Sequence, residues 1–321
     1  MAEYKLLTAE ECIDRLLKIE RPLVVMHKNP DADTVGSSAA LADIFEMLGR
    51  KTYYLCQDEI PARLGFLLDG LSPAKDTSGL TPIAVDIASP AMLGRCGDSL
   101  QFELMIDHHE IGSLFADCYK IPGLSSVGEV IFDLALMLEG MGRIKMTKRL
   151  AEHIFAAMSS DTGAFRYSNA TADTYKKAAM LLSLGIDHAR ISHLLYFSKT
   201  REQILAEEIT SKNLKTADGG KIAYSYVSRD ELSNTNLSLA DFDTGIDVVR
   251  SLIGVEIALF AKETAEGEFK VSLRSTGADV SKIAKELGGG GHIRAAGCTV
   301  RAETAEKAIS DIIIKIENNC Q

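Results

Sequence analysis

The 321-residue sequence contains no Cys-x-x-Cys pair. Zinc knuckles and disulfide frameworks both depend on characteristic cysteine spacings, so neither is expected here. We instead expect free thiols in a reducing cytoplasm. The six cysteines are Cys12, Cys56, Cys96, Cys118, Cys298 and Cys320.

The N-terminal residues lack the features of a secretory signal. Acidic residues such as Glu3 and Glu10 occupy the region where a signal peptide has basic residues followed by an apolar stretch. The sequence also lacks a long apolar run, because Arg250 and Glu256 interrupt its most apolar later segment, residues 248–261. These absences predict a cytoplasmic protein without a membrane segment.

Basic residues are in the minority, with 35 Lys and Arg against 45 Asp and Glu and a net charge of -10. Proteins that bind long nucleic acid without specificity neutralise many phosphates with Lys and Arg, so we expect no long nucleic-acid partner. A short RNA or small nucleotide at one local cationic site is compatible with this charge. The composition, 46% hydrophobic and 25% charged, is typical of globular proteins, and the length suggests two domains.

The first half of the chain alternates short apolar runs with helical patterns. This alternation predicts an α/β fold with a mostly parallel sheet. The expected strands are residues 23–27, 52–56, 83–87 and 104–106, and the expected helices are residues 34–48, 127–138 and 148–158.

The second half predicts a smaller α/β domain. We expect the first domain at residues 1–195, a linker helix at 196–215 and the second domain at 216–321. Within the second domain, the expected strands are residues 221–227 and 269–274, and the expected helices are residues 245–252, 279–287 and 303–317.

Acidic and imidazole residues recur in four short motifs near the ends of the predicted strands. Ligands of open α/β sheets bind beyond the carboxyl ends of the strands, so we expect all four motifs at one crevice. A single Asp after a strand is more often a turn or N-cap residue, but the joint pattern is harder to explain in that way. The motifs are His27-Lys-Asn-Pro-Asp31-Ala-Asp33, Val85-Asp86, Asp107-His108-His109 and Ser160-Asp161-Thr-Gly163.

Four carboxylates at one crevice would raise one another's pKa by like-charge repulsion unless cations offset them. Two divalent ions supply four positive charges against the carboxylates of Asp31, Asp33, Asp86 and Asp161. Carboxylates and imidazoles without thiolates favour Mn²⁺ or Mg²⁺ over a structural zinc, with zinc as an alternative. We therefore predict two divalent ions, with Mn²⁺ as the leading choice.

At these residues the sequence resembles the DHH phosphoesterase family. The motifs similar to the family's four N-terminal motifs are His27-x-Asn-Pro-Asp31-x-Asp33, Asp86, Asp107-His108-His109 and Asp161-Thr-Gly. Those that resemble its DHHA1 substrate domain are Arg274-Ser275, Asp279-Val280, Gly288-Gly-Gly-Gly-His292 and Ala295-Ala-Gly297. The resemblance extends over nearly the whole chain and implies an N-terminal parallel-sheet DHH domain followed by a smaller α/β DHHA1 domain.

The resemblance also implies two metal sites that share one carboxylate. The ligands of the first site would be His27, Asp31 and Asp86, and those of the second Asp33, Asp86, His108 and Asp161. His109 would face the substrate phosphate and act in catalysis together with Asp86. Asp107 would orient an imidazole from behind.

The second domain has features of its own that suit a phosphate. Asp279 can cap a helix, and the glycines after that helix can bring N–H groups close to an anion. These glycines alone indicate a helix stop and a loop, but the neighbouring cationic residues favour substrate binding. Arg166 in the first domain fits a surface position almost as well as a substrate contact. The predicted substrate-binding residues are Arg274, Ser275, Gly289, Gly290, Gly291, His292 and Arg166.

The predicted function is two-metal hydrolysis of a phosphate ester bound between the two domains. Within the family, the sequence is most similar to the nanoRNase subgroup, whose members degrade very short oligoribonucleotides and dephosphorylate 3'-phosphoadenosine 5'-phosphate (pAp). The nearest alternatives are a phosphodiesterase for linear dinucleotides such as pApA or pGpG, and an inorganic pyrophosphatase. A non-catalytic nucleotide-binding regulator is the alternative from a different class. The oligomeric state is left open, with a homodimer among the alternatives.

Overall fold

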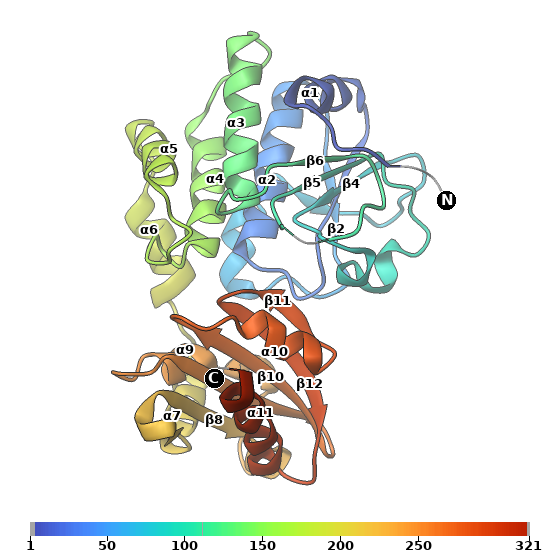
Figure 1. Ribbon diagram of the computed structural model, residues 1–321. Coiled ribbons are helices and arrows are strands. Elements are labelled where there is room, and N and C mark those ends of the chain that lie inside the picture. The colour runs from blue at the N-terminus through green and yellow to red at the C-terminus, as the bar shows by residue number, and fades with distance from the viewer. Residues whose placement is uncertain (1–3, 111, 320–321) are drawn as a thin grey trace. The chain divides into compact units, whose positions relative to one another are not determined.

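The computed structural model describes residues 4–110 and 112–319, and Figure 1 shows its elements. The chain divides into two compact units between Ser198 and Lys199. The first unit has a six-stranded parallel sheet, and the second, which is smaller, has a mixed sheet with helices. This arrangement confirms the predicted α/β fold class. Most of the predicted linker helix forms α7, Arg201–Lys212, which lies within the second unit.

The first sheet has a reversal in its strand order. From edge to edge the order is β3-β2-β1-β4-β5-β6, and every neighbouring pair is parallel. The chain therefore adds β2 and β3 on one side of β1, and β4 to β6 on the other. The strands are β1 Pro22–Val25, β2 Tyr53–Leu55, β3 Ser72–Pro73, β4 Thr81–Val85, β5 Leu104–Asp107 and β6 Cys118–Lys120.

The two faces of this sheet are covered differently. Side chains alternate along each strand, so Val24 packs into the large core with the helices, while Leu23 and Val25 pack on the opposite face against loops and short turns. The helices are α1 Ala9–Lys18, α2 Ala32–Met47, α3 Val127–Gly140, α4 Lys148–Asp161, α5 Ala172–Ser183 and α6 His188–Ser192. The short 3₁₀ helices are η1 Ala62–Leu67, η2 Pro90–Met92 and η3 Gly94–Gly97, and η4 His193–Phe197 is a short π-helix.

Helix α2 is buried on all sides, because it packs against β1, α3 and α4. Figure 1 shows α2, α3 and α4 beside one another. Close approach of α4 requires glycine on both neighbours. A Cβ at Gly36 of α2 would lie 2.9 Å from the His153 carbonyl oxygen, and a Cβ at Gly128 of α3 would lie 2.6 Å from the Cβ of Ala157. Glycine at these two positions thus allows α4 to pack closely against α2 and α3, which places the start of α2, with Asp33, near the end of α4, with Asp161.

The second unit has the strand order β11-β12-β10-β9-β8-β7. Strands β8 and β9 are parallel, and the other neighbours are antiparallel. The strands are β7 Lys215–Ala217, β8 Ile222–Val227, β9 Ile257–Ala265, β10 Glu268–Ser275, β11 Gly290–His292 and β12 Ala295–Arg301. The helices after α7 are α8 Arg229–Ser233, α9 Gly245–Arg250, α10 Val280–Glu286 and α11 Ala305–Asn319, with short turns η5 Asp218–Gly220 and η6 Leu239–Phe242.

Two expectations based on composition can be compared with the described residues. The five cysteines among them are free thiols, and Cys320 lies outside the described residues. In residues 4–110 and 112–319, no helix is both long enough and apolar enough to cross a membrane.

Candidate metal centre

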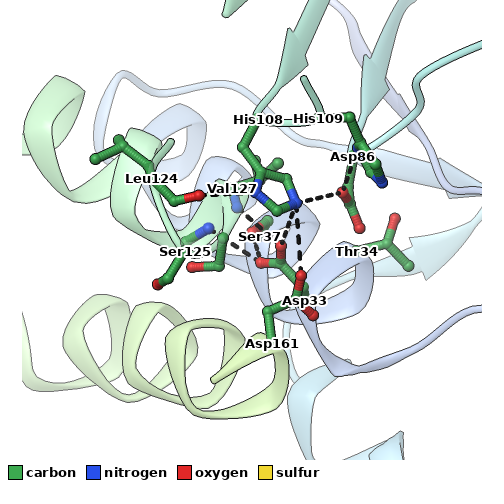
Figure 2. Close-up of polar contacts among 12 residues, drawn as sticks. Asp33, Thr34, Ser37, Asp86, His108, His109, Leu124, Ser125, Val127 and Asp161 are labelled. Carbon is green, nitrogen blue, oxygen red and sulfur yellow. Dashed lines mark hydrogen bonds and ion pairs between the residues drawn. The ribbon is translucent and has the colours of Figure 1, made fainter. Parts of the chain in front are cut away.

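The polar motifs of the first unit meet at the carboxyl ends of its central strands. His27 follows β1, Asp86 follows β4 and His108 follows β5. Between β1 and β4 the strand order reverses, and at such a switch point the connecting loops diverge and leave a ligand crevice. Figure 2 shows Asp33, Asp86, Asp161 and His108 pointing toward one another there.

Helix ends supply the remaining residues. Asp31 is the N-cap of α2, and its Oδ1 accepts hydrogen bonds from the N–H groups of Asp33 at 3.0 Å and Thr34 at 3.1 Å. Asp33 lies in the first turn of the same helix. Asp161 is the last residue of α4, so the packing of α4 against α2 brings the carboxylates of Asp161 and Asp33 together.

Asp86 has a left-handed backbone, with φ of 61°. Its N–H still donates to the carbonyl oxygen of Ile106 at 2.9 Å, so the residue extends the pairing of β4 with β5 before the chain turns away. Left-handed conformations are uncommon outside glycine, and aspartate adopts them more readily than most residues. The turn leaves the Asp86 carboxylate among the imidazoles of His27, His108 and His109.

Asp33 is fully buried and held by three donors. Its Oδ2 accepts from the N–H of Val127 at 2.8 Å, and its Oδ1 accepts from the N–H of Gly128 and the hydroxyl of Ser37, both at 3.0 Å. Val127 and Gly128 are the first residues of α3, whose N-terminal partial positive charge favours a carboxylate. The orientation of Asp33 is therefore fixed by α3 as well as by its own helix.

His27 and His108 are arranged in the same way. The Nδ1 of His27 lies 2.8 Å from the carbonyl oxygen of Lys28, and that of His108 lies 3.1 Å from the carbonyl oxygen of Leu124. A carbonyl oxygen can only accept, so Nδ1 carries a proton in both rings. In the neutral imidazoles Nε2 then carries the lone pair that could ligate a metal ion, and each Nε2 faces the carboxylates.

Three groups of side chains in the described residues are close enough to share an ion: His27, Asp31 and Asp86; Asp33, His108 and Asp161; and Asp86, His108 and His109. Within the first group, His27 Nε2 lies 3.7 Å from Asp31 Oδ1 and 3.6 Å from Asp86 Oδ2. Around His108 Nε2 the distances are 3.5 Å to Asp161 Oδ2, 3.6 Å to Asp86 Oδ1 and 4.0 Å to Asp33 Oδ2. The first group has the residues of the first predicted ligand set, and the second group has those of the second set apart from Asp86. One oxygen of Asp86 faces His27 and the other faces His108.

These distances suit metal ions better than direct hydrogen bonds. Two ligand atoms of one ion, each about 2.0 to 2.2 Å from it, lie no more than about 4.4 Å apart, and a hydrogen bond is shorter than the distances seen here. The buried Oδ1 of Asp86 accepts no hydrogen bond from any described residue. A cation provides the partner that this oxygen lacks, so the residues present fit divalent ions.

The electrostatics of the metal-free site point the same way. Burial raises the pKa of Asp33, and the charges of Asp86 and Asp31 raise it further, well above its ordinary value. Burial and the charge of Asp33 likewise raise the pKa of Asp161. Burial alone would lower the pKa of His27, but its contacts with Asp31 and Asp86 raise it to about 11. The cluster thus takes up protons when it lacks metal.

His109 differs from the two imidazoles above because its Nδ1 faces a carboxylate. Nδ1 lies 2.7 Å from Oδ1 of Asp107, whose other oxygen lies 3.6 Å from the ammonium of Lys120. Burial lowers the pKa of His109, but the hydrogen bond to Asp107 and the charge of Asp86 raise it above its ordinary value. Asp107 thus orients an imidazole, as the sequence predicts, and that imidazole is His109.

Arg166 lies on the turn that follows Asp161. Its Nε donates to the carbonyl oxygen of Gly163 at 2.7 Å, so the side chain folds back on its own turn. Gly163 has φ of 55°, and a Cβ there would meet the ring of Tyr167. Arg166 follows Asp161 by five residues, but its hydrogen bond to the Gly163 carbonyl stabilises the turn and does not involve the Asp161 carboxylate.

The predicted substrate residues of the second unit gather where β10, β12 and β11 lie side by side. Arg274 of β10 and His292 of β11 both pair with Ala295 of the intervening strand β12. The side chain of His292 lies outside what the structure describes, so only its backbone is placed. With strands about 4.8 Å apart, the Arg274 and His292 backbones are separated by about 10 Å.

The glycines beside them bring backbone close to backbone. A Cβ at Gly289 would lie 2.1 Å from the carbonyl oxygen of Gly297, and Gly291 has φ of 138°, which other residues rarely adopt. Arg274 Nη1 donates to the Leu273 carbonyl oxygen at 2.9 Å, and the Ser275 hydroxyl donates to the carbonyl oxygen of Ala278. Gly290, which lies between Gly289 and Gly291, is the first residue of β11.

The sequence gives no indication of the groups that hold the ligands from behind. The Leu124 carbonyl and the N–H groups of Val127 and Gly128 are backbone atoms, which no residue type identifies. Ser37, four residues after Asp33 on α2, has the helical spacing that could have indicated a contact.

Comparisons with known proteins identify two domain families in this chain. Residues 21–158 match the DHH family, N-terminal domain, and residues 219–318 match the DHHA1 domain. The bifunctional oligoribonuclease and PAP phosphatase NrnA of Thermus thermophilus is 27% identical over 93% of this chain and 90% of its own length. The cyclic-di-AMP phosphodiesterase PdeA of Listeria monocytogenes is 25% identical over 93% of this chain, but over only 47% of its own length.

A solved structure shares the fold. The crystal structure of an exopolyphosphatase-related protein from Bacteroides fragilis superposes with a TM-score of 0.85, at 22% identity over 96% of this chain and 94% of that one.

Proposed function

Because the chain belongs to the DHH phosphoesterase family and carries a DHHA1 domain, we propose that it hydrolyses very short oligoribonucleotides and pAp with two divalent ions. DHH phosphoesterases depend on metal ions, and this chain has the acidic and imidazole clusters to bind them. The substrate assignment follows the NrnA relative, which aligns along nearly its whole length. Mn²⁺ is the ion we propose, because the ligands are carboxylates and imidazoles without a thiolate.

The arrangement of Asp86 between two ligand groups carries the proposal. One of its oxygens lies 3.6 Å from His27 Nε2 and the other 3.6 Å from His108 Nε2. In this assignment His27 and Asp31 complete one site, and Asp33 and Asp161 complete the other. When bound, two ions supply an activated water and offset charge on the phosphoryl oxygens.

The protein's own groups have separate tasks in this mechanism. His109, held by Asp107 and with a raised pKa, would present its protonated imidazole to the phosphate and stabilise the charge that develops there. Arg274 and Ser275, with the glycines of residues 289–291 and His292, would hold a second phosphate or the base. Arg166 would assist from the turn beside Asp161.

The test is a substrate panel of pAp, pApA, a five-nucleotide RNA and a long single-stranded DNA, each with Mn²⁺ and with EDTA. We expect Mn²⁺-dependent turnover of pAp and the short RNA and little turnover of the long strand. The PdeA relative supports a second candidate, a phosphodiesterase for linear dinucleotides, which predicts that pApA is the best substrate by kcat/KM. Binding of these nucleotides without turnover of any would instead favour a regulator.

A further inference from the structure

Glu129 lies in the first turn of α3 and is fully buried, although its charge is not part of the metal centre. Its Oε1 accepts hydrogen bonds from the hydroxyls of Ser125 at 2.5 Å and Thr174 at 2.6 Å. Its Oε2 lies 3.3 Å from the ammonium of Lys177. Burying a charge is unfavourable unless it is paired and hydrogen-bonded, and here Ser125, Thr174 and Lys177 meet that requirement.

Lys177 is also buried and comes from a different helix. Its ammonium donates to Asp133 at 2.8 Å and lies 3.5 Å from Asp173. Burial lowers the pKa of Lys177, but the carboxylates of Asp133 and Glu129 raise it above its ordinary value. Glu129 therefore connects α5, through Thr174 and Lys177, with the start of α3. It also connects α5 with Ser125, the residue before the N-cap of α3.

The segment that Glu129 holds, residues 124–128, contacts two of the proposed metal ligands directly and a third through Asn169. The Leu124 carbonyl accepts from Nδ1 of His108, and the N–H groups at the start of α3 bind Asp33. The Ser125 carbonyl accepts from Asn169 at 3.4 Å, and Asn169 also donates to the backbone carbonyl of Asp161 at 3.0 Å. One short segment thus contacts one imidazole and one carboxylate directly, and is linked through Asn169 to the backbone of Asp161.

We propose that Glu129, anchored by Thr174 and Lys177, is a positioning residue that fixes residues 124–128 so that His108 and Asp33 are held ready for metal. Its carboxylate contacts Ser125, Thr174 and Lys177 and acts through Ser125 and the first turn of α3. This inference rests on the proposed metal centre. Residues that orient ligands from behind typically change metal affinity by about 10- to 100-fold when altered.

The test compares Glu129→Gln with a control buried carboxylate, Asp43→Asn. Asp43 lies on α2, the helix of Asp33, and is paired with His153 at 2.8 Å and Arg149 at 2.7 Å. It is ten residues beyond Asp33, or about 15 Å along the helix. Both variants keep the side-chain size and remove one buried charge, so both should lower the melting temperature of the metal-free protein.

Mn²⁺ affinity, measured by titration calorimetry on the metal-free proteins, separates the two. We expect Glu129→Gln to bind Mn²⁺ about 10- to 100-fold more weakly than wild type, and Asp43→Asn to bind it with wild-type affinity. Ser125→Ala removes only the link to the segment and should weaken binding in the same direction by a smaller factor. That variant decides the matter if Glu129→Gln does not fold.

Wild-type affinity in Ser125→Ala and Glu129→Gln, or equal losses in Glu129→Gln and Asp43→Asn, would overturn the positioning role and leave the proposed function intact. A wild-type protein that takes up no Mn²⁺ would overturn the proposed function and this inference with it.

Discussion

His108 and His109 have ring centroids only 4.7 Å apart, yet their imidazoles are held by different acceptors. The Nδ1 of His108 faces a backbone carbonyl, which leaves Nε2 directed at three carboxylates. The Nδ1 of His109 faces the carboxylate of Asp107 instead. This difference is the basis on which we propose His108 as a metal ligand and His109 as a residue that acts on the substrate.

Replacing each histidine by alanine should therefore have different consequences. His108→Ala should lose bound metal and activity together. His109→Ala should keep its metal while turnover falls by about 10²- to 10⁴-fold, because a group that acts on the transition state is removed. Metal content after dialysis against Mn²⁺, measured beside the rate on pAp, tests both statements, and equal metal loss in the two variants would contradict the separation.

Mn²⁺ binding should release protons and strengthen as pH rises. In the metal-free protein the pKa of His27 is raised to about 11, so at neutral pH its imidazole holds a proton that an ion must displace. Burial and neighbouring charges also raise the pKa of Asp33, so more protons are displaced there as pH falls. Calorimetric titrations in buffers of different ionisation enthalpy give the number released. Affinity that does not change between about pH 6 and 8 would be inconsistent with these shifted pKa values.

Arg274→Ala should affect natural substrates selectively. If the guanidinium positions a second phosphate, kcat/KM on pAp should fall by about 100-fold, since loss of positioning removes transition-state stabilisation. On bis(p-nitrophenyl) phosphate, which has no second phosphate, the rate should stay near that of wild type.

Arg301→Ala is the matched control for that experiment. Arg301 lies on β12 with its side chain 85% exposed, and it pairs with Glu268 at 3.3 Å, so its loss should alter neither rate. Parallel losses on both substrates in Arg274→Ala would assign Arg274 to the fold or to the metal centre.

The sequence predicted the parts of the fold that have strong local patterns. The predicted strand at 104–106 and helix at 148–158 correspond to β5 and α4. The hydrophobic pattern did not indicate β9. The apolar residues at the start of this strand follow closely on those of helix α9, so the sequence shows one apolar segment without the alternation that marks a strand. Strands β11 and β12 were also missed, since Gly290, Gly291 and the Ala295-Ala-Gly297 run have low strand propensity. Their place in the sheet depends on the pairing of β12 with β11 and with β10, which local sequence does not reveal.

The sequence indicates why the predicted ligands lie together, because each of three ligands lies near the end of a predicted strand. Strand ends of a parallel sheet meet at one edge, which accounts for His27, Asp86 and His108. The supporting contacts could not be predicted, because they use backbone groups of residues 124–128 and a buried Glu129 that sits in an ordinary helical pattern. Such contacts depend on how α3, α4 and α5 pack, and packing is not visible in local sequence.

Asp86 is proposed to join two metal sites, and the number of ions that the protein binds tests this role. Titration of Mn²⁺ into the metal-free wild-type protein should show two ions per chain. Asp86→Asn should weaken the binding of both ions. The substitution replaces a charged carboxylate, whose two oxygens face His27 and His108, by a neutral amide with a single oxygen. A wild-type protein that binds a single ion, or an Asp86→Asn variant that binds two with wild-type affinity, would contradict the account.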